Sequence, residues 1–125
     1  MNAAERYPIG TPDQKWNDAD KSAWLALQSV KRFYKAQVLA KVLALGERFT
    51  LEQYGALAID KDKYPLYALK SNNWQVDKPI VLITGGVHGY ETSGVQGAIR
   101  FMESKAQAYA EHFNIVLIPC VSPWG

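Results

Sequence analysis

Two short, continuously apolar runs with a helical pattern between them are the feature that most constrains the fold. IVLI occupies residues 80–83 and NIVLI occupies residues 114–118. Because neither run alternates with polar residues, we expect the first to be a central parallel strand covered on both faces and the second to be another buried strand. Apolar residues between the runs recur at helical spacing: Val95, Ala98, Ile99, Met102, Ala106 and Tyr109. Residues 80–119 therefore predict a βαβ unit with a right-handed crossover.

An antiparallel hairpin is predicted immediately before this unit. RFTLEQYGALAI has the alternation of a strand, with Gly55 as an irregularity that indicates a bulge. DKDKYP turns the chain, and LYALKS returns as a second strand. We therefore expect residues 48–71 to form a hairpin, which adds antiparallel strands to the sheet.

The N-terminal part of the chain has a helical pattern from about Asp18 to Leu45. Its apolar stripe consists of Trp24, Leu27, Val30, Phe33 or Tyr34, Val38, Val42 and Leu45. Asp18 or Asp20 is the expected N-cap, and Gly46 is the expected stop. A run of this length predicts two helices with a break near RFYK, because helices beyond about 20 residues are less common.

These elements predict an α/β fold with three α-β-α layers and a mixed, partly parallel sheet that is incomplete at its C-terminal side. The 125 residues fit one domain. Residues 1–16, which carry two prolines and a glycine, predict an irregular lead-in. We interpret residues 17–125 as the N-terminal part of a single domain.

Charge and composition exclude several functional classes. The formal net charge is +2, and no basic block accompanies it, so we expect no nucleic-acid or anionic-membrane partner. Cys120 is the only cysteine, so no disulfide can form within the chain, and a reducing compartment is favoured. We expect its side chain to be a small buried hydrophobic group rather than a nucleophile. The polar N-terminus and the absence of a long apolar run predict a soluble, cytoplasmic protein.

The loop TGGVHGYETSG, residues 84–94, carries the residues with the clearest chemistry. His88 and Glu91 offer an imidazole nitrogen and a carboxylate oxygen, which are both ordinary zinc ligands. They follow a buried strand, where ligands of open α/β sheets collect. Four glycines would let the backbone take left-handed or crowded conformations there: Gly85, Gly86, Gly89 and Gly94. Thr92 or Ser93 stands where the N-cap of the following helix is expected.

A phosphate-binding loop is the alternative for this segment. Gly89 and Gly94 have the spacing of a P-loop, but Val95 and Gln96 replace the lysine and hydroxyl residue that would hold phosphate and magnesium. The pattern therefore favours zinc. A catalytic zinc usually has three protein ligands, so the loop supplies two of the three. The only other histidine, His112, lies about 18 helical residues away, or roughly 25 Å, and we interpret it as a surface residue.

The loop and its flanks resemble a known family. PIVLITGGVHGYETSG resembles the first zinc-ligand segment, with its H-x-x-E motif, of the zinc carboxypeptidases, the carboxypeptidase A-like metallopeptidase family. NIVLIPCVSPWG is similar to the next strand of that family and its Pro-x-Gly turn, here Pro123 and Gly125. The resemblance extends over residues 48–125.

This resemblance implies a zinc-dependent hydrolase of peptide or amide bonds near a C-terminal carboxylate. His88 and Glu91 would hold one Zn²⁺ with a later histidine. The general base, a glutamate, and the substrate-binding arginines are expected beyond Gly125, so we expect the chain to be inactive alone. The expected substrates are peptides or N-acyl amino acids. The alternatives are a zinc deacylase of the aspartoacylase or succinylglutamate desuccinylase type, and a shortened, non-catalytic module that binds a partner or itself through an open sheet edge.

Overall fold

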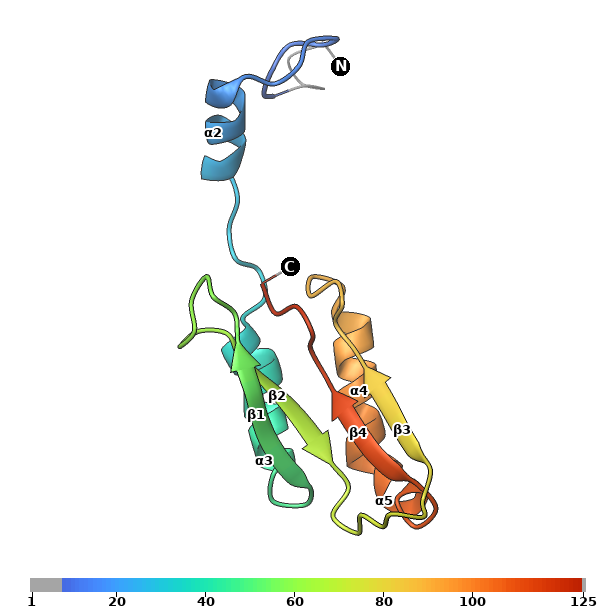
Figure 1. The fold of residues 1–125 in the computed structure, drawn as a ribbon. Helices are drawn as coiled ribbons and strands as arrows, with labels where there is room; N and C mark the ends of the chain where they lie inside the picture. The colour runs from blue at the N-terminus through green and yellow to red at the C-terminus, as the bar shows by residue number, and fades with distance from the viewer. Residues whose placement is uncertain (1–7, 125) are drawn as a thin grey trace. The chain divides into compact units, whose positions relative to one another are not determined.

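Four strands form one mixed sheet in the order β1-β2-β4-β3 (Figure 1). The computed structural model describes residues 8–124. The strands are β1 (Thr50–Ala56), β2 (Pro65–Lys70), β3 (Ile80–Thr84) and β4 (Asn114–Ile118). β1 pairs antiparallel with β2, β2 pairs antiparallel with β4, and β3 pairs parallel with β4. The α/β class and the mixed, partly parallel, open sheet expected from the sequence are thus confirmed.

The hairpin and its bulge lie where the sequence placed them. Leu51 faces Leu69 across β1 and β2, and the register shifts between Gln53 and Gly55. The shift follows from the glycine, since a strand position without a side chain tolerates the extra residue of a bulge. Beyond the bulge the pairing continues to Ala56 and Pro65.

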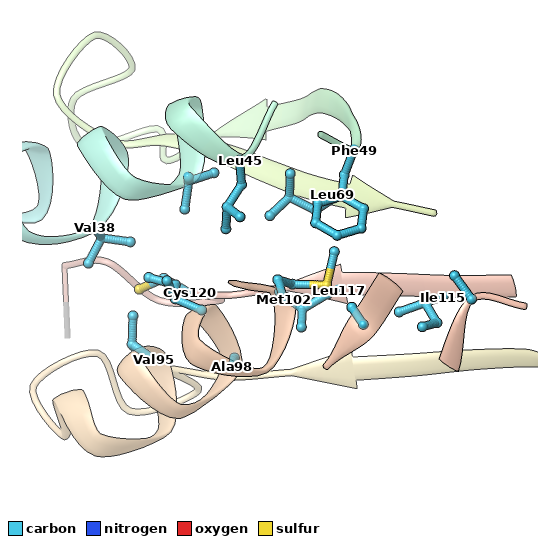
Figure 2. Packing of buried hydrophobic residues seen from close by; sticks show 14 residues of the cluster. Val38, Leu45, Phe49, Leu69, Val95, Ala98, Met102, Ile115, Leu117 and Cys120 are labelled. Carbon is cyan, nitrogen blue, oxygen red and sulfur yellow. The ribbon is translucent and has the colours of Figure 1, made fainter. Parts of the chain in front are cut away.

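The helices that follow Arg32 pack on one face of the sheet. They are the π-helix η1 (Lys35–Leu39) and the α-helices α3 (Ala40–Leu45), α4 (Thr92–Ser104) and α5 (Ala106–Tyr109). Figure 2 shows Leu45, Met102 and Leu117 directed into the same core, from α3, α4 and β4. The stripe predicted for residues 95–106 is buried as expected: Val95, Ala98, Ile99, Met102 and Ala106 are each at most 7% exposed. Tyr109, the last residue of the predicted stripe, is 52% exposed.

Within residues 32–124 the other face of the sheet carries no helix, and this corrects one expectation. β3 is an edge strand, and the central parallel strand is β4. Ile80 and Leu82 are 65% and 62% exposed, so β3 is covered on one face only. The reason is that α3 and α4 share one core and therefore one face, and residues 32–124 provide no second helical layer.

The prediction that the N-terminal half of the helical stripe is a buried helix face is also wrong. The chain divides into two compact units, one up to Lys31 and one from Arg32 onward. In the first unit, helix α2 (Asp18–Ala26) contains no buried residue. Its N-cap is Asn17, which accepts from the Asp20 amide, and Asp20 completes the capping box, so neither predicted aspartate is the cap. Leu27 and Val30, 70% and 58% exposed, lie outside any helix.

In the second unit the helical stripe is buried from Val38 onward. Val38, Val42 and Leu45 are core residues, and Gly46 is the C-cap of α3 as predicted. The predicted break near RFYK agrees with the non-helical stretch that ends where η1 begins at Lys35. None of the helices in residues 8–124 is long and apolar enough to cross a membrane.

Two leucines on α3 test this placement of the core. Leu45 is 4% exposed and Leu43 is 49% exposed. Leu45→Ala should lower the free energy of unfolding by about 2–5 kcal/mol, because it removes buried methyl groups and leaves a cavity. Leu43→Ala should change it by less than about 0.5 kcal/mol. Urea denaturation followed by circular dichroism measures both values, and equal losses in the two variants would contradict the packing of α3.

Candidate metal centre

The loop after β3 is fixed to the segment after β4 by backbone hydrogen bonds. Gly85 N–H donates to Ile118 O at 2.9 Å, and Val121 N–H donates to Gly85 O at 3.0 Å. Ser122 N–H then donates to Gly86 O at 2.9 Å. The parallel pairing therefore continues past both strands, and it places the loop at their carboxyl ends, where open α/β sheets bind ligands.

Two of the four loop glycines are required by their surroundings. Gly86 has a φ of +63°, and a Cβ atom there would lie 2.6 Å from Val95 Cγ2. At Gly85 a Cβ atom would lie 2.8 Å from the backbone oxygens of both Gly94 and Pro119. Gly94 has room for a side chain, so its glycine is not explained by crowding. Glycine is thus required at residues 85 and 86 because the start of α4 and the segment after β4 lie too close to the loop for a side chain.

His88 and Glu91 are the two corners of a tight turn. Glu91 N–H donates to His88 O at 3.0 Å, which closes the turn around Gly89 and Tyr90. Across the turn, His88 Nδ1 and Glu91 Oε2 lie 3.0 Å apart. Two ligand atoms at roughly 2.1 Å from a tetrahedral zinc are separated by roughly 3.3 Å. The spacing and the donor types of this pair therefore fit a zinc ion that replaces their mutual hydrogen bond.

Glu91 is also the N-cap residue of α4, but its carboxylate does not cap the helix. The side chain makes no hydrogen bond to the first helical amides and bonds to His88 instead. The prediction that Thr92 or Ser93 is the N-cap is therefore wrong by one or two residues. Ser, Thr, Asp and Asn are the usual capping residues, at about 1 kcal/mol each, so α4 begins without this stabilisation.

Both side chains are open to solvent, at 76% and 70% exposure for His88 and Glu91. Within residues 8–124, no third histidine, cysteine, aspartate or glutamate joins them in a group that could hold a metal. His112 follows α5 and is exposed, as expected of a surface residue. The structure therefore brings two predicted ligands together and does not bring His112 to them.

Cys120 lies behind the loop. Its Sγ atom is 3.1 Å from the position that a Cβ atom on Gly86 would occupy, and its side chain is buried, as predicted. Burial raises the pKa of the Cys120 thiol from 9.0 to about 11, against a smaller opposing effect of the Ser122 backbone hydrogen bond. At neutral pH the thiol is protonated, so Cys120 acts as a packing residue beneath the loop.

Arg32 contacts the loop from the start of the second unit. Its Nη1 atom donates to the carbonyl oxygen of Tyr90 at 3.0 Å, and its guanidinium lies 5.3 Å from the centre of the Tyr90 ring. Sequence reasoning missed this contact, because the two residues are 58 positions apart and no spacing pattern relates them. Pro123 lies just beyond the Cys120 segment, while Gly125, the last residue of the Pro-x-Gly turn, lies outside the described residues.

Gly86 and Gly97 form a matched pair that tests the crowding of the loop. Gly86→Ala should lower the free energy of unfolding by about 1–3 kcal/mol, because alanine is strained at a positive φ and its methyl group meets Val95. Gly97 lies within α4, where a methyl group would have no atom within 4 Å. Gly97→Ala should raise stability by about 0.5–1 kcal/mol. Chemical denaturation of both variants checks the prediction, and a neutral Gly86→Ala would contradict the loop geometry.

The raised pKa of Cys120 predicts a loss of stability at alkaline pH. Between the ordinary value of 9.0 and the folded value of about 11, the unfolded chain binds fewer protons than the folded chain. The free energy of unfolding therefore falls as pH rises through this window. Burial also raises the pKa of Tyr34 above 10.0, which adds to the fall at higher pH. Urea denaturation at stepped pH should show a shallower fall in Cys120→Ala, and an unchanged slope would contradict the buried thiol.

Comparisons with known proteins agree with this architecture. No protein-family model and no curated protein matches the chain. Solved structures do match it. A candidate metallopeptidase from Shewanella denitrificans OS217 is 27% identical with a TM-score of 0.59, and one from Shewanella amazonensis SB2B is 26% identical with a TM-score of 0.61. Each match covers 70% of this chain and 32% of the other chain, so the chain spans about a third of the length of these proteins.

A third neighbour comes from a more distant protein. Bovine thrombin-activatable fibrinolysis inhibitor, solved in complex with tick carboxypeptidase inhibitor, is 22% identical with a TM-score of 0.54 over 68% of this chain and 29% of its own. At this identity the likeness concerns the fold alone. Together, the order of the sheet and these neighbours show that the chain has a zinc carboxypeptidase-like fold.

Proposed function

We propose that this chain is the N-terminal part of a metallocarboxypeptidase-like zinc hydrolase and carries two of the three protein ligands of one Zn²⁺. The observation that supports this most directly is the 3.0 Å separation of His88 Nδ1 and Glu91 Oε2 at the carboxyl end of β3. The fold of the metallopeptidase neighbours gives that pair a functional context.

The chain's own residues supply the orientation of the ligand pair. Gly85 and Gly86 attach the loop to the β4 exit, and the turn from His88 to Glu91 presents both donors on one side. When bound, zinc supplies Lewis-acid polarisation of a carbonyl oxygen and lowers the pKa of water. The side chains of His88 and Glu91 are both exposed to solvent, so a substrate and a third protein ligand from outside residues 8–124 could approach them.

We further propose that the reaction is hydrolysis of a peptide or amide bond near a C-terminal carboxylate, with peptides or N-acyl amino acids as substrates. The bovine neighbour's complex with a carboxypeptidase inhibitor supports a peptide ligand for this kind of fold. On this proposal, the general base and the arginines that would bind the carboxylate do not belong to residues 8–124. A deacylase would use the same zinc pair and would differ in those later residues.

A non-catalytic binding module is a second candidate, which the open sheet favours. Within residues 8–124, β3 is an edge strand that pairs only with β4, and its own Ile80 and Leu82 expose large apolar side chains. Exposed apolar edge strands readily pair with another chain. The two candidates differ in one measurable respect, because the binding module requires no metal at His88 and Glu91.

Zinc binding by the His88–Glu91 pair separates the two candidates. His88→Ala should abolish zinc binding at the loop, since it leaves a single carboxylate donor. His112→Ala is the matched control, because His112 is exposed and belongs to no donor group within residues 8–124. Zinc titration of the chain, followed by the imidazole proton resonances of the two histidines, measures both sites. Perturbation of the His88 resonances alone supports the hydrolase proposal.

The opposite result is equally informative. If millimolar zinc, which is enough to occupy a weak two-ligand site, leaves the His88 resonances unchanged, or if His88→Ala binds zinc as the unmodified chain does, the metal assignment is wrong. The binding-module candidate would then remain.

A further inference from the structure

One peptide unit within the proposed metal loop is held at both of its ends. This is the unit between Tyr90 and Glu91. Its carbonyl oxygen accepts from Arg32 Nη1 at 3.0 Å, and its N–H donates to His88 O at 3.0 Å. Because both polar groups are engaged, rotation of this peptide would break two hydrogen bonds. The direction in which Glu91 leaves the backbone depends on that rotation.

Arg32 contacts the side chain of Tyr90 as well as its backbone. The guanidinium lies 5.3 Å from the ring centre, within the range of about 6 Å in which a cation is attracted to an aromatic face. A planar guanidinium can stack on a ring and donate a directed hydrogen bond at the same time, which the ammonium group of lysine does less well. The turn is therefore held at Tyr90, one of its two central residues, between His88 and Glu91.

Arg32 directly precedes a segment that is attached to the core of its unit. Two residues later, the hydroxyl of the partly buried Tyr34 donates to Pro65 O at 2.7 Å, at the start of β2. A second polar link connects α3 to α4, where Lys41 Nζ donates to Gln96 Oε1 at 2.6 Å. Gln96 Nε2 also donates to Gln37 O at 3.3 Å. The contact of Arg32 with the loop thus connects two fixed parts of the second unit.

We propose that Arg32 is a positioning residue that holds His88 and Glu91 in their metal-binding arrangement before the metal binds. The inference rests on the proposed function, because it assumes that this pair binds zinc. An exposed four-residue turn without such an anchor would have to be ordered when the ion binds, and that ordering weakens affinity. Arg32 removes part of this requirement without contacting the metal.

Arg32→Gln tests the proposal, with Arg100→Gln as the matched control. Arg100 is an exposed arginine on α4 whose Nη1 lies 3.7 Å from Glu103 Oε2, on the helix rather than on the loop. In the 125-residue chain, the zinc dissociation constant from the shift of the His88 imidazole resonances should rise about three- to tenfold in Arg32→Gln. It should be unchanged in Arg100→Gln. Arg32→Lys should give an intermediate value.

A measurement without metal makes the result independent of zinc affinity. In the metal-free chain, hydrogen exchange of the Glu91 amide should be faster in Arg32→Gln than in the unmodified chain, because the peptide unit has lost one of its two restraints. Exchange of core amides in β4 should be the same in both, which shows that the fold is intact.

The outcomes distinguish this inference from the function on which it rests. If His88→Ala abolishes zinc binding but Arg32→Gln binds zinc as tightly as the unmodified chain, the role of Arg32 is overturned and the metal site stands. If zinc does not perturb His88 at all, the proposed function fails. If Glu91 exchange is unchanged in Arg32→Gln, the restraint on the peptide unit is disproved whatever the zinc affinity.

Discussion

The parallel pairing of β3 with β4 is the interaction on which the rest of this structure depends. Two parallel neighbours require a connection that returns the chain to the same end of the sheet, and α4 with α5 is that connection. The crossover helix then has to begin at the carboxyl end of β3, so the loop that carries His88 and Glu91 is confined between a strand end and a helix start. The hydrogen bonding also continues past the two strands, through Gly85 and Gly86, and so fixes the first residues of the loop.

The site departs from the local rules that stabilise the remainder of the unit. Along α4 the apolar residues are buried in one core with β4 and α3, which is the ordinary source of helix stability. At its first turn, however, the N-cap carboxylate of Glu91 bonds to His88 rather than to helical amides. Gly86 has a left-handed conformation that other residues avoid. Deviations of this kind concentrate at functional sites, where geometry serves binding more than stability.

Much of the fold was predictable because it depends on short-range periodicity. The stripe around Met102 and the bulge at Gly55 follow from local spacing, and both are confirmed. The failures concern information that is not local. The sequence of β3 indicates a strand buried on both faces, but the helices of residues 32–124 cover only one. The pairing of His88 with Glu91 is local and follows from their spacing, whereas Arg32 reaches the loop from a segment 58 positions away, so no pattern of neighbouring residues reveals that contact.

The attachment of the loop to the β4 exit has a consequence for the order of events during synthesis. Gly85 and Gly86 receive their hydrogen bonds from Val121 and Ser122, which emerge from the ribosome only after the whole crossover has been made. Until then, the residues that precede the turn from His88 to Glu91 are not held in place, so the two side chains do not form a fixed site in the nascent chain. Contacts between distant segments form late because the intervening chain must first be ordered. The loop is therefore expected to mature after the hairpin of β1 and β2, whose partners are close in sequence.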